Sequence, residues 1–250
     1  MRDPETILIT GASSGIGAAL ARAYAGRCRL LALTGRDAGR LAAVAADCRA
    51  AGAEVVDETV DVVDRRRMAD LIGRIDERAP IDLVVANAGI DGAALAGDER
   101  FYGTMEVNLI GVLNTVLPAI SPMQRRGRGQ IAVISSLAGY RGMPGAVAYG
   151  ASKAAVRSLG EGLRGRLAAS GIAVSVVTPG FVESRITASN TFPMPFQWSA
   201  ERAAERIRRD LARNRGRIAF PWPLYAGVWL LNVLPSALAD AITARSPRKG

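Results

Sequence analysis

Ile7-Leu8-Ile9-Thr10-Gly11-Ala12-Ser13-Ser14-Gly15-Ile16-Gly17 is the stretch that decides the fold. It joins a short apolar run to a turn with three glycines, and a helical pattern follows. Glycine lets the backbone approach a phosphate closely, and a helix that starts after the turn points free N–H groups at the anion. The order strand, glycine turn, helix predicts a dinucleotide-binding unit, with a plain tight turn as the alternative. The predicted pyrophosphate-binding residues are Gly11, Ser13, Ser14, Gly15, Ile16 and Gly17.

Short apolar runs alternate with helical stretches along most of the chain. This alternation predicts an α/β fold of the Rossmann type, a doubly wound parallel sheet in a single domain of residues 1–250. The runs are mostly apolar throughout, as in strands buried on both faces. Strands are predicted at Thr6–Thr10, Arg29–Thr34, Ala53–Val60, Leu83–Ala86, Gln130–Ser135 and Ala173–Thr178. Helices are predicted at Ile16–Ala25, Ala38–Ala51, Asp64–Arg78, Asp98–Pro118, Tyr149–Ala169 and Ala200–Arg217.

The composition excludes several kinds of chemistry. The 250 residues contain no histidine, so Ser-His-Asp hydrolysis and histidine-based zinc sites are ruled out. Cys28 and Cys48 lack metal-ligand spacing, and we expect no metal site. The two cysteines are expected to be free thiols. The chain starts at Met1 and runs directly into a strand-like segment, without a signal-peptide pattern. Both observations predict a reduced, cytoplasmic protein.

The net charge of +9 comes almost entirely from arginine, because lysine occurs only at Lys153 and Lys249. Such a charge can favour nucleic acid or an anionic membrane surface, and a solvated basic surface is the simpler interpretation. Aromatic and basic residues are not interleaved, so we expect no nucleic-acid partner.

The end of the second predicted strand bears on the choice of cofactor. An acidic residue there favours the free 2′-hydroxyl of NAD(H). This chain instead has Leu33-Thr34-Gly35-Arg36, and the Arg36 guanidinium can bind a 2′-phosphate. We therefore expect NADP(H) in preference to NAD(H), although Asp37 blurs that preference. Asp61 and Val62, after the third strand, are predicted to contact the adenine.

A second group of residues suits proton transfer. Tyr149 and Lys153 are four residues apart, so a helix places the phenol and the ammonium on one face. A neighbouring cation is expected to lower the pKa of the phenol. Ser136 ends a strand, where its hydroxyl can hydrogen-bond a substrate oxygen. A plain helical pair is the alternative for Tyr149 and Lys153, and the sparing use of lysine argues against it.

These motifs together resemble the short-chain dehydrogenase/reductase family over about residues 5–185. The resemblance rests on the glycine turn, Asn87-Ala88-Gly89, Asn108, Ser136, Tyr149 with Lys153, and Pro179-Gly180. It implies strand order 3-2-1-4-5-6-7 and catalysis by Asn108, Ser136, Tyr149 and Lys153. It also implies that Lys153 binds the nicotinamide ribose and that Asn108 holds a water in the proton path. The further cofactor contacts that it implies are Asn87, Ala88, Gly89, Tyr149, Lys153, Pro179, Gly180, Val182 and Ser184, the last in place of the family's usual threonine.

The chain departs from the family pattern after residue 185. We expect residues 1–185 to form the core, and residues 186–250 to form a substrate lid and an atypical apolar, helical C-terminal extension. Ile218–Leu234 carries no charge and is interrupted by Pro221 and Pro223. It is shorter than the ~20 residues of a membrane-spanning helix. A helix that caps the cleft or forms a dimer interface is the favoured interpretation, and weak contact with a membrane surface is the alternative. We expect a homodimer, and the family's usual tetramer is in doubt.

The residues predict an NADP(H)-dependent oxidoreductase that moves a hydride between nicotinamide and a carbonyl or secondary alcohol. Tyr149 is the general acid in reduction and the general base in oxidation. Phe, Met and Trp side chains in Thr191–Trp198 suggest a lid over an apolar substrate, unless they simply pack on the core. The competing hypothesis is a non-catalytic NADP-binding regulator or scaffold on the same fold.

Overall fold

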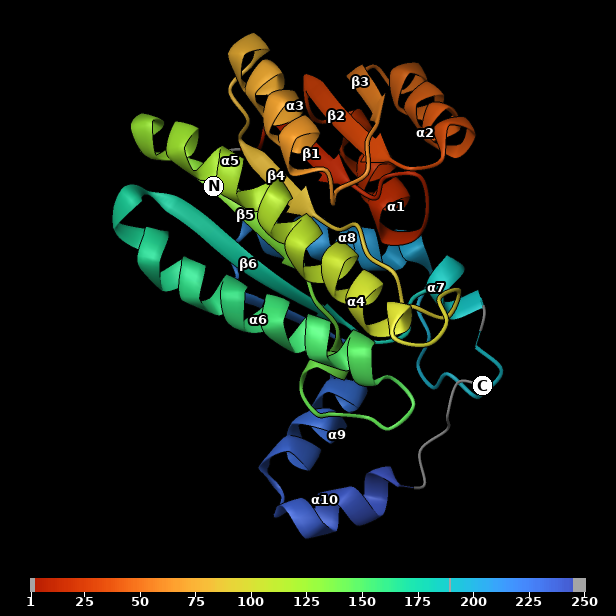
Figure 1. Cartoon of the computed structure of the whole chain (residues 1–250). Coiled ribbons are helices and arrows are strands. Elements are labelled where there is room, and N and C mark those ends of the chain that lie inside the picture. Colours follow the sequence, from red (N-terminus) through yellow and green to blue (C-terminus); the bar gives the residue numbers. More distant parts are fainter. Residues whose placement is uncertain (1–2, 189, 245–250) are drawn as a thin grey trace.

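The computed structural model describes residues 3–188 and 190–244, so Met1 and Lys249 lie outside the described residues. Its centre is a seven-stranded parallel sheet with the order β3-β2-β1-β4-β5-β6-β7 (Figure 1). This is the predicted fold class and the strand order that the family resemblance implied. The strands are β1 (Thr6–Thr10), β2 (Leu30–Gly35), β3 (Glu54–Thr59), β4 (Leu83–Ala86), β5 (Gly129–Ile134), β6 (Ile172–Pro179) and β7 (Arg217–Phe220).

Helices cover both faces of the sheet. The main helices are α1 (Gly15–Ala25), α2 (Ala38–Ala50), α3 (Arg65–Arg78), α4 (Glu99–Met105), α5 (Gly111–Arg126), α6 (Val147–Leu167), α7 (Arg185–Ala188), α8 (Ala200–Ala212), α9 (Trp222–Val233) and α10 (Ser236–Thr243). Successive strand residues point to opposite faces, so two apolar cores form. Ile7 and Ile9 pack in the core with α1, α2 and α8, whereas Leu8 packs in the core with α3, α5 and α6. Figure 1 shows these helices as two layers, with the sheet between them.

The sheet order reverses between β1 and β4, which are adjacent in the sheet although β2 and β3 intervene in the chain. The helices that follow these two strands lie on opposite faces of the sheet. The loops at the carboxyl ends of β1 and β4 therefore diverge and leave a crevice, the usual ligand site of open α/β sheets. The glycine turn and Asn87-Ala88-Gly89 both lie at this crevice.

The predicted end of a helix at Pro118 is wrong. After a single π-helical turn (Glu106–Ile110), α5 continues through Pro118 and Pro122 to Arg126. Buried Ala119 and Met123 pack in the core below the helix, and this packing offsets the backbone hydrogen bonds that the prolines cannot make. The helix ends instead at Gly127, whose φ of +64° is the left-handed conformation typical of a helix C-terminus.

The predicted helix Ala200–Arg217 is too long, and the strand that follows it was missed. α8 ends at Ala212, and Asn214 then takes a φ of +50° in the turn that leads to β7. β7 has only four residues, pairs in parallel with β6, and buries Ile218 and Phe220. Such a short segment beside a proline carries little strand signal, and pairing with β6 decides its structure.

The core extends beyond residue 185, the expected boundary. Ala203, Ile207 and Leu211 of α8 and the buried residues of β7 share one core with α1 and α2. Among the described elements, α9 and α10 stand out from the body of the fold, next to the loop before α6 (Figure 1). The C-terminal extension in the structural sense therefore begins after β7.

One helical run, Glu99–Arg126, is long and apolar enough to cross a membrane by length and composition alone. This run contains α4, the π-helical turn and α5. Half of its apolar window is buried inside the fold, where α5 packs against α3 and the strands. Burial in the core accounts for its composition.

Candidate active site

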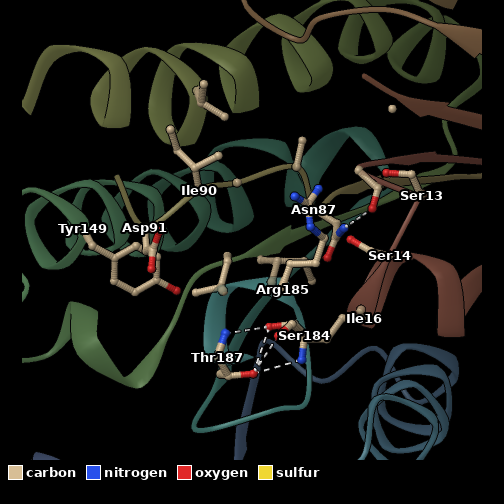
Figure 2. Close-up of a pocket in the computed structure, with 18 of the residues that line it drawn as sticks. Ser13, Ser14, Ile16, Asn87, Ile90, Asp91, Tyr149, Ser184, Arg185 and Thr187 are labelled. Carbon is tan, nitrogen blue, oxygen red and sulfur yellow. Dashed lines mark hydrogen bonds between the residues drawn. The ribbon is translucent and has the colours of Figure 1, made fainter. Parts of the chain in front are cut away.

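A cavity of about 880 Å³ lies at the carboxyl ends of the strands, in the crevice between β1 and β4. It brings together segments that are far apart in the sequence. In Figure 2, Ser13, Ser14 and Ile16 lie at one end, and Tyr149 and Asp91 lie at the other. The predicted site residues that line the cavity are Gly11, Ser13, Ser14, Gly15, Ile16, Arg36, Asp61, Val62, Asn87, Ala88, Gly89, Ser136, Tyr149, Lys153, Pro179, Gly180, Val182 and Ser184. Gly17 and Asn108 lie behind this lining.

The glycine turn depends on close backbone contacts. Gly11 has a φ of +65°, and a β-carbon on Gly17 would overlap the Gly11 carbonyl oxygen. The Asn87 side-chain amide donates to the carbonyl oxygens of Thr10 (3.0 Å) and Gly11 (3.1 Å). Asn87 therefore holds the turn in place, and Gly17 leaves room for it.

The N-terminus of α1 is suited to an anion. Its N-cap residue, Ser14, is extended and makes no side-chain capping hydrogen bond. By contrast, Asp37 and Asp64 cap α2 and α3 through their carboxylates. The first N–H groups of α1 thus face the cavity without a side-chain cap, and they carry the positive end of the helix dipole. The small residues and the length of the cavity fit a dinucleotide.

Two arginines and one aspartate lie where the adenosine ribose of a dinucleotide would bind. Arg36 and Arg40 both line the cavity. Asp37 accepts the Arg40 backbone N–H (2.9 Å), and its carboxylate forms an ion pair with the Arg40 guanidinium (2.7 Å). Arg40 therefore compensates the Asp37 charge. The sequence prediction missed Arg40, although its position three residues after Asp37 was available as a signal.

The loop after β3 is held from the neighbouring helix. Asp61 accepts the backbone N–H of Val63 (3.2 Å), which shapes the turn. The Asn114 amide of α5 donates to the carbonyl oxygens of Val62 (2.9 Å) and Val63 (3.2 Å). Asn114 is a positioning residue that no local pattern indicated.

Ser136, Tyr149 and Lys153 converge at the other end of the cavity. Tyr149 and Lys153 lie on one face of α6, with the Lys153 ammonium 5.7 Å from the centre of the Tyr149 ring. The Ser136 hydroxyl accepts the Ala138 N–H (3.1 Å) and donates to the Pro179 carbonyl (3.5 Å), and it lies close enough to Tyr149 to affect the pKa of the phenol. Lys153 donates to the carbonyl oxygen of Ile134 (2.9 Å). Backbone groups thus orient both the serine and the lysine.

The pKa of Tyr149 differs from the sequence expectation, which had Lys153 lowering it. Burial raises the pKa of the phenol, the hydrogen bond from Ser136 lowers it, and the nearby charge of Asp91 raises it. Lys153 is not among the groups that shift this pKa, and its ammonium donates to the Ile134 carbonyl. At neutral pH Tyr149 is therefore a protonated phenol, which is the form that donates a proton.

Burial lowers the pKa of Lys153 to about 8, and this predicts how stability depends on pH. The unfolded chain keeps the lysine proton up to a pKa of 10.5, so between these values it binds more protons than the folded state. Stability therefore rises with pH. From about pH 8 to about pH 10, wild type should gain about 2 kcal/mol in free energy of unfolding relative to Lys153→Met. Denaturant unfolding of the two cofactor-free proteins measures their free energies of unfolding at each pH. If the two free energies changed with pH in parallel, the prediction would be wrong.

Asn108 lies in the π-helical turn between α4 and α5, a local distortion that is frequent at functional sites. Its side-chain oxygen Oδ1 accepts the Ile90 N–H (2.8 Å). Its side-chain nitrogen Nδ2 donates to the Ile90 carbonyl (2.8 Å) and to the Ser152 hydroxyl (3.0 Å). Both amide hydrogens are therefore used. Asn108 connects the loop after β4 to α6, close to Gly89 and Lys153.

The loop after β6 forms a wall of the cavity. The Ser184 backbone N–H donates to the Thr187 hydroxyl (2.9 Å), and the two hydroxyl oxygens are 3.3 Å apart (Figure 2). Arg185 also lines the cavity, and Figure 2 shows it between the two ends. The sequence prediction missed Asp91, Arg185 and Thr187, which directly follow or flank motifs that it used.

The expected lid, Thr191–Trp198, does not contribute to the lining of the cavity within the described residues. Trp198 stacks on Phe220 of β7, with ring centres 4.8 Å apart, and lies under the Arg202 guanidinium. Phe192 packs edge-to-face on Phe181. Trp198 thus packs on the core, the alternative that the sequence left open, whereas Phe196 is exposed.

The chain is similar to known proteins over most of its length. The family model described as short chain dehydrogenase matches residues 5–193. An uncharacterized oxidoreductase of Myxococcus xanthus is 38% identical over 96% of both chains. A solved actinorhodin polyketide ketoreductase with NADPH is 28% identical, with a TM-score of 0.80 over 90% of this chain and 98% of its own. A solved short chain dehydrogenase/reductase from Burkholderia phymatum, in complex with NAD, is 25% identical. Its TM-score is 0.82, and the match covers 99% of this chain and 98% of that protein.

Proposed function

The chain belongs to the short-chain dehydrogenase/reductase family and is an oxidoreductase that uses a nicotinamide cofactor, and from this premise we propose that it reduces the carbonyl of an apolar ketone with NADPH. The observation that carries the proposal is the convergence of Ser136, Tyr149 and Lys153 on a cavity that also contains the glycine turn. A proton donor and a site for a hydride donor thus share one space.

The residues of the chain divide the work of reduction. A bound nicotinamide supplies the hydride to the carbonyl carbon. The Tyr149 phenol donates its proton to the carbonyl oxygen as negative charge develops there, and the Ser136 hydroxyl donates a hydrogen bond to the same oxygen. Lys153, held by its hydrogen bond to the Ile134 carbonyl, would bind the nicotinamide ribose. Asn108 positions the loop after β4. In the reverse direction the same groups oxidise an alcohol, with Tyr149 as the base.

The preference for NADP(H) is supported by Arg36 and Arg40. Arg36 offers a planar fork of donors to a 2′-phosphate. Arg40 neutralises Asp37, the nearby acid that would otherwise repel that phosphate. The actinorhodin ketoreductase binds NADPH and the Burkholderia protein binds NAD, so the proposal rests on the residues of this chain.

The preference for an apolar substrate is supported by Ile90, Leu95 and Ile186, which line the same cavity as Tyr149. The ketoreductase activity in the name of the actinorhodin relative accords with a carbonyl substrate. The aromatic residues of Thr191–Trp198 do not enter this argument, because none of them lines the cavity.

A panel of ketones with NADPH consumption as the readout tests the proposal. We expect kcat/KM to rise about threefold to fourfold for each methylene added to an alkyl methyl ketone, until the cavity is filled. Small hydroxylated ketones should be poor substrates. Leu95→Ser should flatten the dependence on chain length, while the matched exposed variant Leu117→Ser should not. Equal activity on both classes of ketone would contradict the apolar preference.

A further inference from the structure

The C-terminal hairpin, defined as α9 and α10, has an apolar outer surface that nothing in the described chain covers. Trp222 is 74% exposed, and no residue of α9 is fully buried. The large exposed apolar side chains of the hairpin are Trp222, Trp229, Leu230, Val233, Leu238 and Ile242. A helix on the surface of a protein normally has a polar outer face, and a large exposed apolar patch marks an interaction site.

The inner face of the hairpin is already occupied. Tyr225 packs edge-to-face on Tyr140, with ring centres 5.5 Å apart. Leu224 lies against Gly180, at the wall of the cavity. The carboxylate of Asp240 on α10 forms an ion pair with Arg141 (2.6 Å) in the loop before α6. The hairpin is therefore held in place against the rim of the active site, and its apolar outer face is turned away from the protein.

The charges of the hairpin indicate which partner fits. α9 contains no charged residue, and Asp240 is the sole charged side chain of α10. The sequence directly after α10 supplies three cations, Arg245, Arg248 and Lys249, in a chain of net charge +9. An apolar helix next to basic residues matches the boundary between acyl chains and anionic headgroups, where tryptophan is also favoured. The 12 residues of α9 rise about 18 Å, too short to cross a bilayer core of ~30 Å.

We propose that the outer face of the C-terminal hairpin docks on an anionic membrane surface, with the hairpin lying in the plane of the interface. A second copy of the chain is the other occupant to consider. A two-fold contact between two hairpins places the same uncharged α9 on both sides and supplies no anionic surface for the cations that the sequence carries after α10. Anionic lipid complements these charges instead. Docking in this way places the rim of the active site next to the bilayer.

Vesicle flotation of the full-length protein tests the proposal. Vesicles of phosphatidylcholine alone are compared with vesicles that also contain phosphatidylglycerol. We expect about tenfold or stronger partitioning to the anionic vesicles. The double variant Trp229→Ser/Leu230→Ser should weaken that partitioning about tenfold or more, and Arg245→Gln/Arg248→Gln/Lys249→Gln should remove the preference for anionic lipid. The control Phe101→Ser/Phe196→Ser changes equally exposed apolar residues elsewhere and should partition as wild type.

Molar mass and circular dichroism of each variant are measured in parallel, so that loss of folding is distinguished from loss of docking. The proposal is overturned if the wild-type protein does not bind anionic vesicles. It is also overturned if the hairpin variant partitions to them as strongly as wild type. A hairpin variant with an altered molar mass and unchanged vesicle binding would assign the face to a second copy. None of these results depends on turnover, so they are independent of the proposed ketone reduction.

Discussion

Tyr149→Phe should lower kcat for ketone reduction by about 10²- to 10⁴-fold and leave the Kd for NADPH unchanged. The substitution removes one hydroxyl, the group that donates the proton to the carbonyl oxygen. Its hydrogen-bond partner Ser136 stays oriented by the backbone N–H of Ala138, so the site keeps its shape. Steady-state NADPH oxidation measures kcat, and cofactor fluorescence measures the Kd.

Tyr102→Phe is the matched control, because that tyrosine is 68% exposed and lies outside the cavity. It should leave kcat unchanged. Undiminished turnover by Tyr149→Phe on a working substrate would show that another group donates the proton. A large rise in the Kd for NADPH together with a normal kcat would instead show that Tyr149 serves cofactor binding.

The double variant Arg36→Ala/Arg40→Ala should raise the Kd for NADPH about a hundredfold and leave the Kd for NADH nearly unchanged. Removing Arg36 deletes the charged hydrogen bonds to the 2′-phosphate, which are worth about 1.5–3 kcal/mol. Removing Arg40 leaves the Asp37 carboxylate without its ion pair, beside the same phosphate. NADH carries a free 2′-hydroxyl and meets neither effect. Fluorescence titration with both cofactors gives the two Kd values.

Arg22→Ala is the control for the loss of a positive charge, because Arg22 pairs with Asp47 on the surface and does not line the cavity. It should shift neither Kd. The proposal fails if wild type binds NADH as tightly as NADPH, or if the double variant weakens both cofactors to the same extent. Asp37→Asn in the double variant should restore part of the NADPH affinity, since it removes the repelling charge.

The sequence predicted the parallel sheet well because its strands are continuous apolar runs. The predicted strand Thr6–Thr10 matches β1, and Leu83–Ala86 matches β4. Errors arose where tertiary contacts override local preference. Two prolines lie inside α5, and the short strand β7 exists because β6 offers it an edge. Local propensity contains neither effect.

The residues of the candidate site could be predicted from the sequence better than their surroundings. The glycine turn, Arg36 and the pair Tyr149 and Lys153 could be identified from spacing and residue type. The environment of these groups could not. The raised pKa of the Tyr149 phenol follows from burial and from Asp91, and burial is a property of the assembled fold. Asn114 acts through contacts with the loop after β3, so no local pattern identifies it, whereas Arg40 pairs with Asp37 three residues earlier and could have been identified from the sequence.

The sequence by itself determined the order of strands and helices, the position of the glycine turn and the residues available for proton transfer. These properties depend on neighbours within a few positions, such as apolar alternation, backbone freedom at glycine and i,i+4 spacing on a helix. Only the tertiary structure decided that Trp198 packs on the core and that the hairpin of α9 and α10 keeps an apolar face outward. Both segments carry large apolar and aromatic side chains in the sequence. What separates them is whether another part of the chain reaches them, which packing of the whole molecule decides.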